Sequence, residues 1–318
     1  MKTKNIFQLF VLILLLSYMG KSYAQDPHLS QYDASPVILN AALTGMSDDQ
    51  KYRVVTQFRS QWSSAGCNYT TTSLSFDMAY KDRWGFGAYL LNDDGSQVFN
   101  AFNFVLSGAY RITQANQKKV NLTVGLQAGL IDKSMKSSKL LFDNQYTHGN
   151  FDPDLPSGET YPHNSILMPE VNFGIHYAGA LKDEKIKPYA GIAISHVTNP
   201  KESFYGSKDS HLPLKYLFHG GTKFEVSKGF ILDPKFLIMK QRTATEINVG
   251  MQMSYLAESS GMSIMGGGFY RLKDAAIFDL GFNYKNITFI ISYDMNVSYL
   301  KAFTNKKGGI EFSVMFSK

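Results

Sequence analysis

Bulky apolar residues alternate with small or polar residues along most of the chain after residue 50. The alternation is clearest at 122–130, 247–255 and 278–284. A period of two is the signal of β-strands that carry one apolar and one polar face. After the first 24 residues there is no apolar run of ~18 residues, so no transmembrane helix is expected. The pattern therefore predicts an all-β protein.

The predicted strands are long. Several run for ten residues or more, near the ~9–11 residues with which a tilted strand crosses a bilayer, whereas strands of globular proteins average ~5–6 residues. We expect strands near 50–62, 69–80, 84–93, 98–112, 119–135, 169–180, 187–197, 215–226, 229–242, 246–256, 262–271, 275–284, 287–294 and 308–316. This makes about 14 antiparallel strands, with 12 or 16 as alternatives that follow the same logic.

The connections between these strands sort by length. If the first strand starts in the periplasm, the short turns at 81–83, 227–228 and 285–286 all fall on the periplasmic side. The long connections at 136–168, 199–214 and 295–307 all fall on the outer side. Short periplasmic turns and long outer loops are typical of outer-membrane barrels. The sequence thus favours a transmembrane β-barrel of the outer membrane over a soluble sandwich.

Aromatic residues near strand ends agree with a membrane barrel. Phe316 lies in the last apolar-alternating strand, which we expect to close the barrel against the first strand. Trp62 and Trp84 both fall at strand ends, so they are candidate membrane-interface aromatics; ordinary core packing is the alternative.

The first residues have the features of an export signal. Lys2 and Lys4 precede the apolar stretch 6–16, and Ser22-Tyr23-Ala24 resembles a cleavage site, so the mature chain is expected to start at Gln25. We therefore expect an integral protein of the outer membrane of a Gram-negative bacterium, exported by a cleaved signal. Three parts are predicted: a signal peptide at 1–24, an N-terminal segment at 25–49 that is periplasmic or folds into the lumen as a plug, and the barrel at 50–318.

Composition supports this class. Charged residues make up 18% and aromatic residues 14% of the chain, whereas soluble domains carry about 25% charged residues. Removal of Lys2, Lys4 and Lys21 with the signal takes the 32 basic groups to 29, against 26 acidic groups. Such a small excess gives no argument for a nucleic-acid partner. Cys67 is the one cysteine, so an internal disulfide is excluded.

Motifs of catalysis are missing from the sequence. It contains no G-x-S-x-G elbow, P-loop or H-E-x-x-H motif, and the seven histidines have no spacing typical of a metal site. We expect no enzymatic activity, catalytic residue, cofactor or metal. Arg53 and Arg59 share the lumen-facing phase with Gln57. They are expected to pair with acidic groups of a plug, to bind a partner segment, or to form a salt-bridge network in the lumen.

Blocks of residues along the mature chain resemble the PorP/SprF family. The family's opening is matched by 25–32, Pro36, Asn40-Ala41-Ala42 and Gly45, although the family usually has Asn-Pro-Ala where this chain has Asn40-Ala41-Ala42. Further blocks follow in the expected order: Arg59-Ser60-Gln61-Trp62, 125–130, Lys139-Leu140, Phe142-Asp143-Asn144-Gln145, Gly191-Ile192-Ala193-Ile194-Ser195-His196, Asn199-Pro200, Ser292-Tyr293-Asp294 and Gly308-Gly309-Ile310-Glu311-Phe312.

The resemblance implies an outer-membrane component of the type IX secretion and gliding systems of Bacteroidota. Its implied partners are a secreted surface adhesin, or the periplasmic ring and a peptidoglycan-binding lipoprotein. A transport channel for small or hydrophobic solutes is the alternative function. The candidate interaction or plug residues are Ser30, Gln31, Tyr32, Pro36, Asn40, Gly45, Arg53, Arg59 and Gln61.

Overall fold

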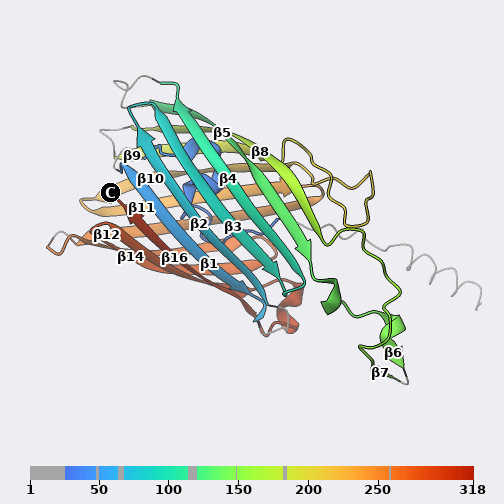
Figure 1. Cartoon of the computed structure of the whole chain (residues 1–318). Helices are drawn as coiled ribbons and strands as arrows, with labels where there is room; N and C mark the ends of the chain where they lie inside the picture. Colours follow the sequence, from blue (N-terminus) through green and yellow to red (C-terminus); the bar gives the residue numbers. More distant parts are fainter. Residues whose placement is uncertain are drawn as a thin grey trace, which may run out of the picture.

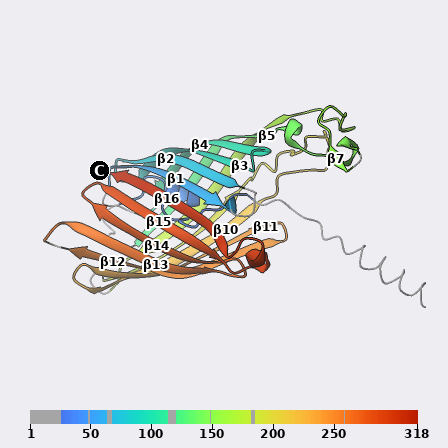
Figure 2. The ribbon, with the colours of Figure 1, turned by 90° about the horizontal axis from the view of Figure 1, so that it is seen from below.

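The chain forms a closed antiparallel barrel of 14 strands (Figures 1 and 2). The computed structural model describes residues 26–47, 50–63, 68–113, 120–147, 149–181, 185–257 and 259–318. The expected signal peptide with its cleavage site, Gln25 and Cys67 lie outside the described residues. Among the described residues, no helix has both the length and the apolarity needed to span a membrane.

The barrel strands confirm the predicted number and closely match the predicted positions. They are β1 (Tyr52–Gln61), β2 (Tyr69–Tyr80), β3 (Trp84–Gly95), β4 (Phe99–Arg111), β5 (Val120–Met135), β8 (Ser165–Gly179), β9 (Ile186–Ser195), β10 (Lys215–Ser227), β11 (Phe230–Gln241), β12 (Ala244–Ala257), β13 (Met262–Arg271), β14 (Ala275–Tyr284), β15 (Ile287–Asn296) and β16 (Lys307–Ser317).

Each strand pairs with its neighbour in the chain, and β1 pairs with β16 to close the barrel. In this closing ladder Val54 lies opposite Phe316 and Arg59 lies opposite Glu311. Closure satisfies the backbone groups of both edges, which is required of any sheet surrounded by lipid. The expected closure of the last strand against the first is therefore confirmed.

One strand starts earlier than the sequence predicted. β8 begins at Ser165, which pairs with Ser134 of β5, and not at Pro169. Pro169 itself has no backbone N–H to donate to a ladder. The structure accommodates Pro169 because its part of β8 lies outside the ladder with β9, which begins at Phe173.

The two ends of the barrel differ. We call the end that carries the connection 136–164, between β5 and β8, the loop end, and the end with Lys81-Asp82-Arg83 the turn end. The first of these connections contains the short elements η3 (Ser137–Lys139), η4 (Asp143–Gln145), β6 (Tyr146–Thr147) and β7 (Asn150–Phe151). The connection 297–306, which contains η5 (Tyr299–Ala302), is also at the loop end. Figure 1 shows the β6–β7 excursion projecting beyond the barrel.

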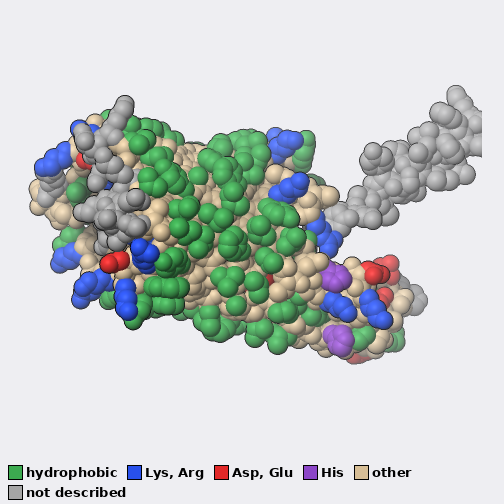
Figure 3. Space-filling view, turned by 90° about the horizontal axis from the view of Figure 1, so that it is seen from above, with side chains coloured by type: hydrophobic (Ala, Val, Ile, Leu, Met, Phe, Trp, Pro, Cys, Tyr) green, Lys and Arg blue, Asp and Glu red, His purple; other side chains and the backbone are tan. Residues whose placement is uncertain are grey.

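The outer surface of the wall is apolar and the inner surface is polar. On β2, Leu74 and Phe76 are exposed on the outside, whereas the alternating Ser73, Ser75 and Asp77 are buried inside. Figure 3 shows apolar side chains spread over the middle of the barrel and lysines and arginines towards its ends. This is the arrangement of a barrel that meets lipid with its outer face.

Candidate functional site

Residues 26–47, here called the plug, fold into the lumen. The plug contains one turn of helix, α2 (Pro36–Leu39), followed by η1 (Ala41–Leu43). Asp26 contacts His196 at the loop end, and Gly45 lies against Met78 and Gly85 near the turn end. Of the two alternatives for the N-terminal segment, the structure therefore shows the lumenal one, with a chain that crosses the barrel lengthwise.

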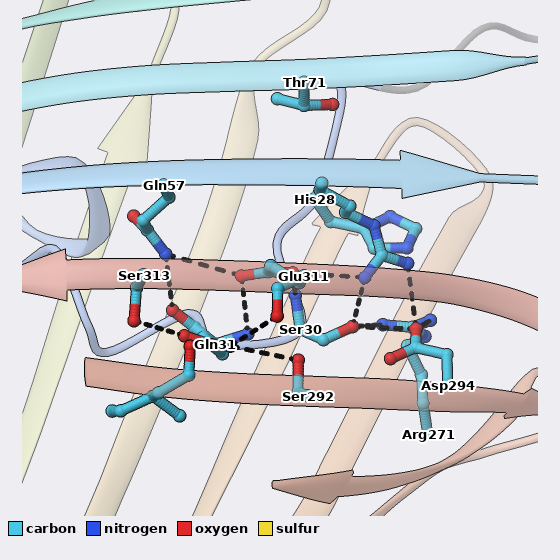
Figure 4. Close-up of polar contacts among 12 residues, drawn as sticks. His28, Ser30, Gln31, Gln57, Thr71, Arg271, Ser292, Asp294, Glu311 and Ser313 are labelled. Atoms are coloured by element: carbon cyan, nitrogen blue, oxygen red, sulfur yellow. Dashed lines mark hydrogen bonds and ion pairs between the residues drawn. The ribbon is translucent and has the colours of Figure 1, made fainter. Parts of the chain in front are cut away.

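Ser30 and Gln31 fasten the plug to the wall near β1, β15 and β16 (Figure 4). The Ser30 and Gln31 backbone N–H groups donate to the two carboxylate oxygens of Glu311, at 2.7 and 3.1 Å. The Gln31 side chain donates to Ser292 at 3.1 Å, and Gln57 donates to the Gln31 carbonyl oxygen at 3.1 Å. The contacts with Glu311 and Ser292 join residues about 260 to 280 apart in sequence, so they fix the plug to the strands that close the barrel.

A buried cluster of charges lies beside Ser30. Arg59 Nη2 and Arg271 Nη2 both donate to Asp294 Oδ2, at 2.8 and 2.7 Å, and Arg59 Nη1 donates to Glu311 at 3.2 Å. Arg59, Arg271 and Asp294 are each 1% exposed, and Glu311 is fully buried. The Ser30 hydroxyl donates to Asp294 at 2.7 Å and accepts from Arg59. Arg271 Nε also pairs with Asp274 at 2.5 Å, and the plug completes the cluster.

Arg53 acts near the turn end through Asp77. Its Nε and Nη2 donate to the two oxygens of Asp77, at 2.9 and 2.7 Å. The Gly45 N–H donates to the same carboxylate at 2.7 Å. Arg53 therefore orients the acceptor that holds the plug where it leaves the lumen.

Asn40 fastens the middle of the plug. Its side-chain amide donates to the carbonyl oxygens of Ile175 and Ile192, at 3.2 and 3.3 Å, and lies 3.1 Å from His219 Nε2. Its oxygen accepts from the Ala42 N–H at 2.9 Å and so caps η1. His176 stacks on His219 with ring centroids 5.6 Å apart.

Glycines of the wall make room for the plug backbone. A Cβ atom on Gly85 would collide with the carbonyl oxygen of Thr44, one on Gly125 with the backbone of Ala41, and one on Gly174 with the side chain of Asn40. These three lumen-facing positions are glycine, and the plug occupies the space that a side chain would fill. Such close backbone approach is a role that glycine alone fills.

The plug also makes an apolar contact with the wall through Leu39. Leu39 packs against Ala193, Leu217 and Leu237 of β9, β10 and β11, with Tyr32 at the edge of the cluster. Pro36 occupies the first position of α2, where its missing N–H costs nothing. The plug is thus held on β9, β10 and β11 by apolar contacts of Leu39 as well as by the polar contacts of Asn40.

A charged latch holds the plug at the loop end. His196, which follows β9, lies with Nε2 2.6 Å from Asp26 and Nδ1 2.8 Å from Glu170. Burial would lower the pKa of His196, but the hydrogen bonds to Asp26 and Glu170 outweigh it and raise the pKa to about 9. Burial would likewise raise the pKa of Asp26, but Lys215 and His196 lower it below its usual range. The imidazolium is therefore charged at neutral pH and bridges plug and wall.

The remaining predicted residues lie apart from this network. Gln61 ends β1 opposite Gly309, and no contact among the described residues joins its side chain to the plug. Trp62 packs edge-on against Tyr69 at the loop end, with ring centroids 5.6 Å apart. Trp84 is 47% exposed on the outer face at the turn end and lies 4.7 Å from Tyr110. The two tryptophans are thus near opposite ends of the barrel.

Several residues of the network were not predicted as site residues. Asp26, His196, Asp294 and Glu311 appeared only within family blocks or the N-terminal segment, and Arg271 was not named. The available signal was a charged residue on the lumen-facing phase inside a strand, as at Asp77 and Glu311. The pairs that these groups form could not be predicted, because most of the partners lie far apart in the sequence.

The sequence profile of the type IX secretion system membrane protein PorP/SprF matches residues 21–316. No curated protein is significantly similar to the chain in sequence. Among solved structures, the fold is similar to the CymD monoaromatic hydrocarbon channel (12% identity, 90% of this chain and 92% of that chain, TM-score 0.53). It is also similar to the Pseudomonas putida toluene transporter TodX (10% identity, 90% and 93%, TM-score 0.53) and to the Ralstonia pickettii toluene transporter TbuX (9% identity, 88% and 92%, TM-score 0.53).

At these identities the solved structures show a shared barrel fold and nothing about what this chain binds. The profile, in contrast, covers the plug and every strand of the barrel. It agrees with the resemblance in the residue blocks, including those of the plug and of β16. The chain is an outer-membrane β-barrel and belongs to the PorP/SprF family of type IX secretion system membrane proteins.

Proposed function

We propose that this chain is a binding partner and anchor in type IX secretion, for a secreted surface protein or for the periplasmic ring. The observation that carries the proposal is the plug, which is fastened at both ends and in the middle of the lumen. In this proposal a barrel whose lumen holds such a plug offers binding surfaces and does not serve as an open pore. In this account the protein acts through its loop-end connections and its plug, without catalysis.

An affinity purification of the tagged protein from native outer membranes, followed by mass spectrometry, tests the proposal. Co-purification of a large secreted surface protein supports a partner dedicated to one cargo. Co-purification of ring components or of a peptidoglycan-binding lipoprotein supports a place in the core machinery. If no such protein is enriched over a barrel control of similar size, the proposal is wrong.

A transport channel for small or hydrophobic solutes is the second candidate. The feature that favours it is a cavity in the lumen at the loop end, with apolar side chains on one wall. Flux of solutes into liposomes that contain the purified barrel separates the two functions. The partner function predicts that the intact plug blocks flux, whereas the channel function predicts selective uptake.

A further inference from the structure

The cavity at the loop end has the size of a ligand site. Its volume is about 510 Å³, within the roughly 300–1,000 Å³ range of small-molecule pockets. Asp26, Pro27 and Ile38 of the plug contribute to its lining. Phe204, from the connection between β9 and β10, lies beside Phe99 with ring centroids 6.4 Å apart.

One wall of the cavity carries an apolar patch although it faces the lumen. Tyr89, Leu91, Phe99, Ala101 and Ile131 all line the cavity. Leu91 is 8% exposed and Ile131 is 3% exposed. On β1 and β2 the buried lumen-facing side chains are mostly arginine, glutamine, serine and aspartate. This wall therefore departs from the polar lining elsewhere and suits an apolar or aromatic body.

Six charged side chains around the cavity neutralise one another. His196 bridges Asp26 and Glu170, and Lys215 lies 3.4 Å from Asp26. Lys133 pairs with Glu202 at 2.5 Å. These three cations and three carboxylates together carry no net charge.

Asp93 is the remaining charge. Thr71 donates a hydrogen bond to its Oδ1 at 2.7 Å. Within the described part of the chain no basic side chain forms an ion pair with it. The rings of Tyr69 and Tyr89 line the same cavity. A carboxylate without a counter-ion next to aromatic faces attracts a cation, and both interactions strengthen as water is excluded.

We infer that this cavity binds a small ligand that carries a positively charged amine or guanidinium head on an aromatic or alkyl body, with Asp93 as its counter-ion. The head lies by Asp93 and the tyrosine rings, and the body lies against Leu91 and Ile131. The site stands independently of the role in type IX secretion, since it depends only on the lumen at the loop end.

Isothermal titration of the purified full-length barrel in detergent tests the site with three probes of matched size. The probes are 2-phenylethylammonium, neutral 2-phenylethanol and anionic 3-phenylpropionate, each corrected for its uptake by micelles. We expect the ammonium probe to bind at least about fivefold more tightly than the other two. Asp93→Asn should remove this preference.

Asp94→Asn is the matched control. Asp94 is the next residue and does not line the cavity, and its carboxylate accepts from the Gln97 N–H at 2.6 Å. Asp94→Asn removes the same charge a short distance away, so this variant should keep the preference for the ammonium probe. Ala101→Phe fills the cavity without changing any charge. It should abolish binding of the ammonium probe, and it decides the question if Asp93→Asn does not fold.

Three results would overturn the inference. The first is equal binding of the three probes to the unmodified protein. The second is that Asp93→Asn and Asp94→Asn weaken binding of the ammonium probe by the same factor, which would indicate a long-range field and no site. The third is that Ala101→Phe binds the ammonium probe as tightly as the unmodified protein.

Discussion

Arg59 shows how single residues join the plug to the wall. It is 1% exposed and pairs with Asp294 of β15 and Glu311 of β16 while it donates to the Ser30 hydroxyl of the plug. Of the uses considered for a lumen-facing arginine on β1, the geometry combines two, a salt-bridge network of the lumen and contact with the plug. Arg59 therefore holds strands and plug at once.

Loss of Arg59 is expected to destabilise the barrel strongly. Arg59→Met leaves Asp294 and Glu311 buried with a single arginine, which typically costs about 3–5 kcal/mol. Urea unfolding in detergent, followed by heat-modifiable migration on gels, measures the change. Lys273→Met, in an exposed turn at the loop end, is the control and should change the free energy of unfolding by less than about 0.5 kcal/mol. Equal stability of the two variants would contradict the assigned role.

His196 makes the latch sensitive to alkaline pH. Its pKa is raised from 6.5 to about 9 in the folded protein, so the folded state binds the proton more tightly than the unfolded state. The stabilisation is then complete below about pH 6.5 and is lost as the pH rises through about 9. It amounts to about 3 kcal/mol at most.

The urea concentration at the midpoint of unfolding should therefore decrease as the pH is raised from 6.5 to 9.5. His196→Gln should be less stable than the unmodified protein at pH 6 and should lack most of this slope. A slope that is the same in both proteins would show that another group titrates and that the latch contributes little.

Strands were predicted better than the plug because their signal is local. The period of two fixes where a strand runs and which face is buried, as on β2 with Leu74 and Ser75. The start of β8 was placed four residues too late, at 169 and not at Ser165. The plug has no such period. Its conformation depends on contacts such as that between Ser30 and Glu311, which are 281 residues apart.

Glycines of the wall offer a test of how the plug fits. Gly125→Ala should displace the plug, because its Cβ would meet the backbone of Ala41, whereas Gly108→Ala on neighbouring β4 meets nothing within 4 Å. Solute flux into liposomes and protease cleavage within the plug should both rise in the first variant. The second variant should behave as the unmodified protein. A plug equally protected in both variants would show that the close approach does not hold it.

At the scale of the molecule, the sequence was sufficient for the class of fold and the family, but not for the state of the lumen. The alternation and the sorted connections predicted 14 strands, and the blocks of residues predicted the family. A plug that lies inside the barrel and one that lies below it have the same local pattern. Only the pairing of plug residues with Asp77, Glu311 and His196 distinguishes them.

The plug can be locked without adding bulk. The Ser35 and Ser75 hydroxyl oxygens lie 2.7 Å apart and both residues are buried, a spacing from which two cysteine sulfurs can reach each other. Ser35→Cys with Ser75→Cys, in a Cys67→Ala background, should therefore form a disulfide that ties the plug to β2. The background variant alone is the control.

The central claim is that this barrel works as a closed partner in type IX secretion. The most direct test is affinity purification of the locked and control proteins from native outer membranes, with quantitative mass spectrometry. The account predicts that the same type IX component or secreted surface protein is enriched with both, to within about twofold. It would be contradicted if neither protein enriched such a partner while the control, and not the locked protein, conducted solute into liposomes.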